Sequence, residues 1–510
     1  MSDNDTNSGT LSKGRILAWK QCSKRLFLEV YRPELAVEDE QTAYWFAMGR
    51  EVGRVARSLE PGGVLIGGGG ERTVQRSGNE GRGVSPDLSS ALEQTRLLLA
   101  VPGGPALFEA TFQYDDVLIR ADMVIPSETG LVLREVKSAS RVKDRHLDDC
   151  AVQNWVMAGA GYRPDRVELA HVDTSFEYRE PDNYEGLLAC RDITQLVSVI
   201  SRDVPDWVRG AKQTLNGPEP TVTPGLQCTD PYDCPFIAHC WQDVPDYPVS
   251  SLPDKGRIVD ELLARGIEDI RDIPAGALTR PLQQRVRQVT IDGNPFVDPE
   301  AGKRLKALPY PRFYLDFETV QFAVPAWLET HPYDQLPFQW SCHIEREPGK
   351  LEQADFLDTS GEAPMRGFSE QLLTILGQQG PVFTYSNFER RIIKEQARRF
   401  PELEAQLFAL LDRLVDLQKI VRQSYYHPAM KGSWSIKAVL PTIAPELDYG
   451  QLEEVKDGTG AQMAYKACIA SGIGEDRRQQ LEKRLREYCR MDTLAMVKVA
   501  WYFQGHRQLG

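Results

Sequence analysis

The chain has 510 residues, of which 41% are hydrophobic and 26% are charged. This composition excludes a collagen-like or low-complexity chain, and the length predicts about three domains. The 60 basic and 73 acidic residues give a net charge of −13, which excludes a uniformly basic nucleic-acid coat protein but not an enzyme with a local basic groove. No apolar stretch is long enough to cross a membrane, and residues 1–10 lack the apolar core of a secretory signal. We therefore expect a cytoplasmic protein.

Apolar periodicity predicts helices at the start of the chain. Apolar residues recur at helical spacing within residues 11–32. Further helices are expected over residues 40–60 and 87–100, with a glycine-containing loop between Gly67 and Pro86.

The pattern then changes to the short apolar runs that are typical of strands. Runs over residues 108–112, 117–125 and 130–137 are separated by polar turns and predict a meander of three strands. The elements expected to follow are a helix over 145–160, a strand over 167–172 and helices over 183–214.

Two neighbouring strands of this meander carry charged side chains among apolar ones. Asp122 lies in the run 117–125, whereas Glu135 and Lys137 lie two residues apart in the next run and share one face of the sheet. Paired carboxylates bind Mg²⁺ or Mn²⁺ through oxygen, and a lysine beside them stabilises charge at a phosphorus centre. The residues alone leave a second interpretation open, a salt bridge on the face of the sheet.

Three of the nine cysteines are evenly spaced, at Cys228, Cys234 and Cys240, in a loop that contains two prolines. An odd number of cysteines argues against a disulfide framework. The spacing leaves three interpretations open: chance clustering, a zinc site completed by His239, or an iron–sulfur cluster completed by a thiolate from elsewhere in the chain.

The order of Asp122, Glu135, Lys137 and the following Gln153 resembles that of the PD-(D/E)XK nucleases. Over residues 11–241 the chain is similar to RecB-like nucleases, particularly the iron–sulfur type found among CRISPR-associated proteins. The resemblance implies a restriction-endonuclease-like α/β domain, catalytic roles for these four residues, and metal binding by Asp122 and Glu135. It also implies a [4Fe–4S] cluster, whose ligands would be Cys22, Cys228, Cys234 and Cys240.

The first domain departs from that family at one position. Gly53 stands where many RecB-like enzymes carry a metal-binding histidine, so Glu51 or Glu109 would have to substitute for it. Otherwise the domain binds metal weakly or only binds DNA.

A second group of acidic residues lies in the C-terminal half. Asp316 and Glu318 alternate with apolar residues in an expected strand, so both point to one face. Burying two carboxylates is costly unless they are compensated, and a divalent cation is the simplest compensation. Glu389 follows a later strand at the start of a helix, and Tyr488 and Asp492 share one face of a helix near the end of the chain.

Together these motifs resemble those of the DEDD exonucleases, which have a DnaQ-like, ribonuclease-H-like fold: a mixed sheet with flanking helices. The resemblance implies phosphodiester hydrolysis with two metal ions and a water oriented by Tyr488. The carboxylates that would hold the ions are Asp316, Glu318, Glu389 and Asp492. Glu389 stands where aspartate is usual, and Asp416 is an alternative third ligand. The C-terminal half also resembles a bacterial family of unknown function.

Basic side chains gather beside both acidic groups and would contact the phosphates of a nucleic acid, with a solvated helix face as the alternative. The residues chosen for this role are Arg134, Arg141, Lys143, Arg390, Arg391 and Lys394. The sequence contains no phosphate-binding glycine loop, so we do not expect ATP dependence.

Three parts are therefore expected: a RecB-like nuclease domain over residues 1–245, a helical linker over 246–308 that resembles half of a helix–hairpin–helix, and a DnaQ-like domain over 309–510. The expected function is a metal-dependent nuclease that acts on single-stranded or end-containing DNA, with RNA as the alternative, in repair, processing or defence. It would carry a [4Fe–4S] cluster and Mg²⁺ or Mn²⁺. The rival interpretations are a nucleic-acid-binding scaffold, with weak or absent catalysis in the first domain and a structural cluster, and a zinc-stabilised protein without nuclease activity.

Overall fold

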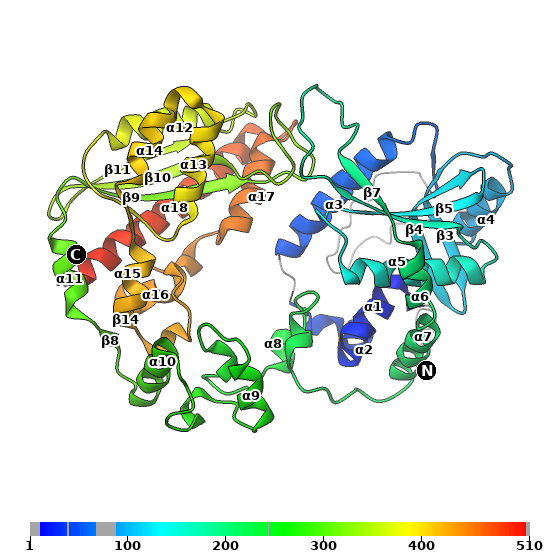
Figure 1. The fold of residues 1–510 in the computed structure, drawn as a ribbon, viewed down its shortest axis with the longest axis horizontal. Helices are drawn as coiled ribbons and strands as arrows, with labels where there is room; N and C mark the ends of the chain where they lie inside the picture. Colours follow the sequence, from blue (N-terminus) through cyan, green and yellow to red (C-terminus); the bar gives the residue numbers. More distant parts are fainter. Residues whose placement is uncertain (1–10, 38–39, 68–87, 243, 506–510) are drawn as a thin grey trace. The chain divides into compact units, whose positions relative to one another are not determined.

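The structure is a computed structural model, and it describes residues 11–37, 40–67, 88–242 and 244–505 (Figure 1). All but the first residue of the loop predicted between Gly67 and Pro86 lies outside the described residues. The chain forms two compact units. Unit 1 comprises Met1–Gln242 and Phe322–Tyr333, and unit 2 comprises Asp243–Gln321 and Asp334–Gly510.

Unit 1 is built on a mixed sheet, and the predicted three-strand meander is confirmed. β3 (Leu107–Tyr114), β4 (Val117–Ser127) and β5 (Gly130–Lys137) are antiparallel neighbours, and β6 (Arg166–Val172) lies parallel to β5. The strand order is β2–β3–β4–β5–β6–β7, and β1 pairs with β4. These outer strands are β1 (Leu11–Ser12), β2 (Val64–Leu65) and β7 (Leu188–Asp192).

Unit 1 also contains eight described α-helices, several of which lie against this sheet (Figure 1). They are α1 (Lys13–Gln21), α2 (Ser23–Tyr31), α3 (Glu40–Ser58), α4 (Leu88–Leu99), α5 (Asp144–Gly159), α6 (Thr194–Ile200), α7 (Val204–Leu215) and α8 (Ile237–Cys240). The helix predicted over residues 11–32 is two helices, because the backbone of Cys22 is extended, with φ −165°. The helix α5 connects the parallel strands β5 and β6, and its Val152 and Val156 join the core of the unit.

Part of the prediction for residues 183–214 was wrong. Helices α6 and α7 lie there, but Leu188–Asp192 is the strand β7, which pairs antiparallel with β6. The edge of β6 would otherwise carry unpaired backbone groups, so a tertiary requirement decided the conformation of this short segment.

The segment Phe322–Tyr333 lies between two strands of unit 2 in the sequence but belongs to unit 1 by its contacts. The carbonyl of Thr330 accepts a hydrogen bond from the backbone N–H of Tyr178 at 3.1 Å. The hydroxyl of Tyr333 donates to the carbonyl of Ser138 at 2.7 Å. Contacts between residues so distant along the chain follow no local sequence pattern. The sequence analysis therefore did not predict that this segment belongs to unit 1.

The sheet of unit 2 has the order β11–β10–β9–β12–β13. The central strand β9 (Arg312–Val320) lies antiparallel to β10 (Leu336–Glu347) and parallel to β12 (Val382–Thr384). The outer strands are β11 (Lys350–Leu357), which is antiparallel to β10, and β13 (Leu414–Asp416), which is parallel to β12.

Helices cover both faces of this sheet (Figure 1). One face, with Phe313 and Leu315 of β9, forms a core with apolar residues of α12 (Met365–Leu376), α13 (Phe388–Arg399) and α14 (Glu404–Leu411). On the other face, Tyr314 joins a core with Val497 of α18 (Glu475–Phe503). The remaining helices on this part of the chain are α15 (Leu417–Ser424), α16 (Ile436–Ile443) and α17 (Gly458–Ile469). None of the described helices is long and apolar enough to span a membrane.

Residues 246–308 were expected as a separate linker, whereas the structure places them within unit 2. Their elements are α9 (Ile258–Ala264), α10 (Pro281–Asp292), β8 (Phe296–Val297) and α11 (Pro299–Lys306). Val286 and Leu305 share a core with Tyr314 and Val497, and β8 pairs with β14 (Tyr425–Tyr426). Burial within unit 2 explains why these short helices carry apolar residues.

A buried guanidinium fixes the start of β9. Arg312 is 1% exposed. Its Nη1 donates to Gln504 Oε1 at 2.8 Å, and its Nη2 donates to the carbonyls of Leu305 at 3.0 Å and Leu308 at 2.6 Å. The side chain thus connects the central strand to α11 and to the residue that follows α18.

Replacing Arg312 should destabilise unit 2. Arg312→Ala leaves buried acceptors without a donor, so we expect the free energy of unfolding to fall by about 3–5 kcal/mol. Arg346→Ala, which removes an exposed ion pair with Glu352, should cost less than about 1 kcal/mol. Urea unfolding followed by circular dichroism measures both, and equal costs would contradict the role given to Arg312.

Candidate functional site

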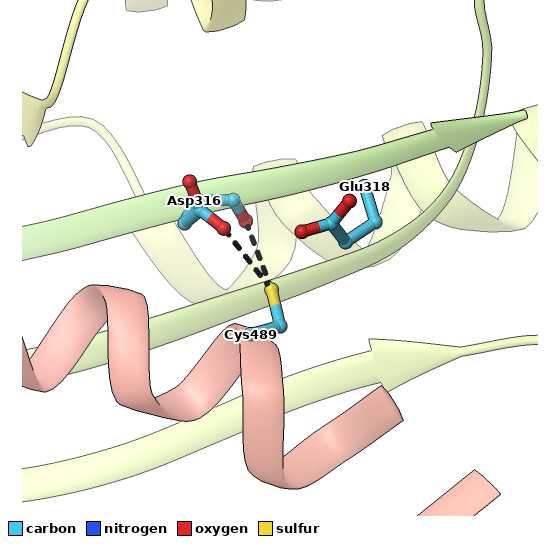
Figure 2. A group of neighbouring side chains, drawn as sticks. All are labelled: Asp316, Glu318 and Cys489. Carbon is cyan, nitrogen blue, oxygen red and sulfur yellow. Dashed lines mark hydrogen bonds between the residues drawn. The ribbon is translucent and has the colours of Figure 1, made fainter. Parts of the chain in front are cut away.

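The strand β9 turns two carboxylates to one face of the unit 2 sheet. Phe313, Leu315 and Phe317 point into the core beneath α12–α14. The alternation of side chains along a strand therefore places Asp316 and Glu318 on the opposite face, beside α18 (Figure 2). Glu318 is buried and Asp316 is half-buried. The two predicted residues do share a face.

Cys489 on α18 is a neighbour of this pair that the sequence analysis missed. Its Sγ lies 3.4 Å from Asp316 Oδ2 and 3.7 Å from the carbonyl oxygen of Asp316 (Figure 2). Donor atoms of Asp316, Glu318 and Cys489 all lie within 4.8 Å of one another. Cys489 precedes Asp492 by three residues and so shares its face of the helix. This spacing is the feature of the sequence from which its place beside the acidic residues could have been predicted.

Asp492 joins the cluster from α18, and two unpredicted residues surround it. The hydroxyl of Tyr449 donates to Asp492 Oδ1 at 2.6 Å. Lys437 on α16 has its Nζ 5.2 Å from the ring centre of Tyr488 and 5.4 Å from that of Tyr449. Lys437 and Tyr449 belong to none of the motifs, because they reach the site only through tertiary packing such as that of α16 against α18.

The two candidates for the third carboxylate differ in burial and in hydrogen bonding. Glu389, in the first turn of α13, is 3% exposed, and its Oε2 has no hydrogen-bond partner within the described part of the chain. Asp416 is half-buried at the end of β13, and its Oδ1 caps α15 by accepting the backbone N–H of Lys419 at 2.9 Å. Glu389 is thus the buried residue with an unused acceptor.

Burial raises the pKa values of these carboxyl groups, and neighbouring carboxylates add to the effect at Asp316, Glu318 and Glu389. Burial, followed by the nearby Asp492 and Glu318, raises the pKa of Asp316 well above its usual range. Burial and Asp492 do the same to the pKa of Glu318. Burial raises the pKa of Glu389 to about 8 and that of Asp492 to about 6. A bound divalent cation would offset this repulsion, because it stabilises the charged carboxylates.

The four residues predicted as the site of unit 1 also converge. Asp122 lies on β4, Glu135 and Lys137 lie on β5, and Gln153 lies on α5. Lys137 Nζ is 2.5 Å from Glu135 Oε1, and Gln153 Nε2 donates to Glu135 Oε2 at 2.7 Å. Asp122 Oδ2 accepts the backbone N–H of Val136 at 2.8 Å.

Two further charged residues lie in this group, and the sequence analysis missed both. Lys13 Nζ is 2.7 Å from Asp149 Oδ1 and 3.2 Å from Glu135 Oε1, and Lys137 Nζ is 2.5 Å from Asp149 Oδ2. Burial lowers the pKa of Lys13, but Asp149 and Glu135 outweigh it and raise the pKa above its usual value. Burial and Glu135 raise the pKa of Asp122 to about 7. Two ammonium groups therefore face three carboxyl groups in unit 1. The positive and negative charges are more nearly equal than in unit 2, where Lys437 is the cation named beside four carboxyl groups.

The four predicted cluster ligands come from two regions of unit 1. Cys22 lies at the break between α1 and α2, and Cys228, Cys234 and Cys240 lie in the loop that ends with α8. The amide of Gln21 joins the regions by donating to the carbonyls of Gln227 and Tyr232, both at 2.7 Å.

The cysteine side chains lie close enough for their charges to interact. Burial raises the pKa of Cys234, and Cys22 and Cys228 raise it further.

The predicted basic residues differ in their surroundings. Arg134 forms ion pairs with Glu60 at 2.6 Å and Glu168 at 2.8 Å, so it is engaged within unit 1. The half-buried residues are Lys143 and Arg390, and the exposed ones are Arg141, Arg391 and Lys394. The exposed residues present their charges to solvent.

Residues 313–435 match a family described as Domain of unknown function (DUF2779). The match includes Asp316, Glu318, Glu389 and Asp416 and ends before α18, which carries Tyr488 and Asp492. No curated protein matches the chain. The family description assigns no chemistry, so a functional assignment depends on the geometry of the sites.

The raised pKa of Glu389 should make metal-free unit 2 less stable as pH rises. A carboxyl group with a raised folded-state pKa contributes its full stability below its unfolded-state value, and this contribution is lost as pH rises through the folded-state pKa. Between pH 4.5 and pH 8, Glu389→Gln should therefore gain stability relative to the unmodified protein. Urea unfolding in EDTA across this range measures the difference. The exposed Glu404→Gln should show no such trend, and a trend of equal size would contradict the prediction.

Proposed function

We propose that the protein is a metal-dependent nuclease and that unit 2 hydrolyses the phosphodiester bond. The observation that carries this proposal is the buried Glu389, whose Oε2 has no hydrogen-bond partner within the described chain. Together with Asp492 it helps to raise the pKa values of the buried Asp316 and Glu318, and Lys437 is a nearby cation. Oxygen donors of this kind suit Mg²⁺ or Mn²⁺.

The strand arrangements support this proposal. In unit 2, the central strand β9 bears the acidic pair. On one side of it, β10 and β11 are each antiparallel to their neighbour, and on the other side β12 and β13 are parallel to β9. This arrangement is expected for a ribonuclease-H-like, DnaQ-like domain. In unit 1, a three-strand meander, a crossing helix and a parallel strand follow one another, as expected for a PD-(D/E)XK domain. Both assignments are part of the proposal.

The residues of unit 2 divide into ligands and groups that position them. Asp316, Glu318, Glu389 and Asp492 would hold the metal ions. Bound there, two divalent ions supply a nucleophilic water at neutral pH and stabilise the leaving oxygen. Tyr449 fixes the orientation of Asp492 through its 2.6 Å hydrogen bond. We propose that Tyr488, one helical turn before Asp492, orients the water.

Unit 1 is proposed to bind nucleic acid, with weaker catalysis or none. Lys13 and Lys137 already neutralise much of the charge of Glu135 and Asp149, so a metal ion would compete with two ammonium groups. This observation favours the scaffold interpretation for unit 1 only. The proposed substrate is DNA that is single-stranded or has ends, with RNA as the alternative.

We also propose that Cys22, Cys228, Cys234 and Cys240 hold a [4Fe–4S] cluster. The donor set fits, since four free cysteines provide the four thiolates that such a cluster requires. The cluster would join the α1–α2 junction to the loop before α8, in addition to the hydrogen bonds of Gln21. We assign it a structural role.

Removing one ligand of unit 2 should abolish hydrolysis. Asp316→Asn keeps the size of the side chain but removes its charge, so we expect the rate on labelled single-stranded DNA with Mn²⁺ to fall about a hundredfold or more, because the metal supplies several kcal/mol of transition-state stabilisation. Asp476→Asn is the matched control, because Asp476 is an exposed acid in the first turn of α18.

The same assay separates the two units. If unit 1 mainly binds nucleic acid, Lys137→Ala should reduce the rate less than about tenfold at saturating DNA. The variant would then lose only binding energy that is the same in the substrate complex and in the transition state. Activity that survives Asp316→Asn but disappears with Lys137→Ala would move the catalytic site to unit 1. Unchanged activity in both variants would refute both assignments.

Cys22→Ser should remove the cluster. Protein purified without oxygen should be brown and contain iron and acid-labile sulfide, and Cys22→Ser should lose both, because a serine oxygen replaces one thiolate ligand. Cys190→Ser is the control, since Cys190 is an exposed residue of β7. A colourless protein with stoichiometric zinc would overturn the cluster assignment.

A further inference from the structure

A pocket of about 410 Å³ opens in unit 2, where β12 and β13 end. These two strands are parallel, and each runs directly into a helix, α13 or α15. Ligands of open α/β sheets commonly bind outside the carboxyl ends of parallel strands. The volume lies within the range of pockets that take small molecules.

The charged side chains of the pocket suit an anion. Arg390 and Lys419 line it together with one carboxylate, Asp416. The guanidinium of Arg390 is held in place because its Nη2 donates to the carbonyl of Leu411 at 2.9 Å. The charge of Asp416 is partly satisfied by the backbone N–H of Lys419. The cations outnumber the carboxylate by two to one, and the amide of Asn387 adds a neutral donor.

The rest of the lining combines the hydroxyl-bearing Thr384 and Ser386 with an apolar part. We expect the apolar part to favour an organic ligand over a small inorganic ion. Leu414, Val415 and Ile420 form this part of the wall. An inorganic phosphate would leave them without a partner, whereas a sugar or base attached to the phosphate would cover them. Charged donors at one side and aliphatic side chains at the other are the surroundings that a nucleotide needs.

The pocket shares the helix α13 with one proposed metal ligand, since Arg390 follows Glu389 directly in that helix. Asp416 lies in the wall of the pocket, and its charge is near enough to Glu389 to help raise the pKa of Glu389.

We propose that this pocket binds one nucleotide unit of the substrate strand, with its phosphate between Arg390 and Lys419 and its sugar or base against Leu414, Val415 and Ile420. For the identity of this ligand the inference rests on the proposed nuclease function. The binding itself involves no hydrolysis and can be measured separately.

The test is calorimetric titration of the full-length protein, in EDTA, with 2′-deoxyadenosine 5′-monophosphate. The unmodified protein should bind it, and Arg390→Gln and Lys419→Gln should each weaken binding about tenfold, because each removes a charge-assisted hydrogen bond. Lys419 is exposed, so its replacement tests the pocket even if loss of the Arg390–Leu411 contact impairs folding. Arg398→Gln, in the last turn of the same helix and exposed outside the pocket, should bind normally.

Two further ligands define what the pocket recognises. Deoxyadenosine without the phosphate and inorganic phosphate should both bind more weakly than the nucleotide. The proposal is overturned if the nucleotide does not bind, if Arg398→Gln weakens binding as much as Lys419→Gln does, or if inorganic phosphate binds equally well. Nucleotide binding by a protein that does not hydrolyse DNA would support the pocket and refute the nuclease, whereas hydrolysis without binding would do the reverse.

Discussion

Repulsion among buried carboxylates is the constraint on which the arrangement of unit 2 depends. Asp316 and Glu318 share a face of β9, and α18 brings Asp492 to them. Burying these groups together costs free energy, so the surrounding structure must hold them in place. Arg312 ties the start of the strand to α11 through buried hydrogen bonds, and the strand lies at the centre of its sheet. A stable scaffold thus maintains a site that is electrostatically unfavourable in the absence of a cation.

Unit 1 also buries several carboxyl groups together, but there the charge is compensated in a different way. Lys13 and Lys137 contact Glu135 and Asp149 directly, so the protein itself supplies the opposite charge. In unit 2, Lys437 lies over two tyrosine rings, and the carboxyl groups keep raised pKa values despite it. Two acidic sites that look alike as motifs therefore differ in how much negative charge the surrounding side chains leave uncompensated, which is why our proposal places hydrolysis in unit 2.

The sequence predicted well those features that depend on local periodicity. The meander in unit 1 and the shared face of Asp316 and Glu318 follow from side-chain alternation. The shared face of Tyr488 and Asp492 follows from helical spacing. It failed where a distant partner decides the conformation: β7 forms because β6 has an edge to pair, and residues 246–308 fold into unit 2 because its core accepts their apolar side chains.

By itself, the sequence determined which residue types could form each site and on which face of a strand or helix they would lie, because both depend on near neighbours along the chain. Only the tertiary structure decided which charges meet. It brought Lys13 to Glu135, Tyr449 to Asp492 and Cys489 to Asp316, and it left Glu389 buried with an unused oxygen. The reason is physical: the charge balance of a buried site is set by every element packed around it, and no single stretch of sequence contains that sum.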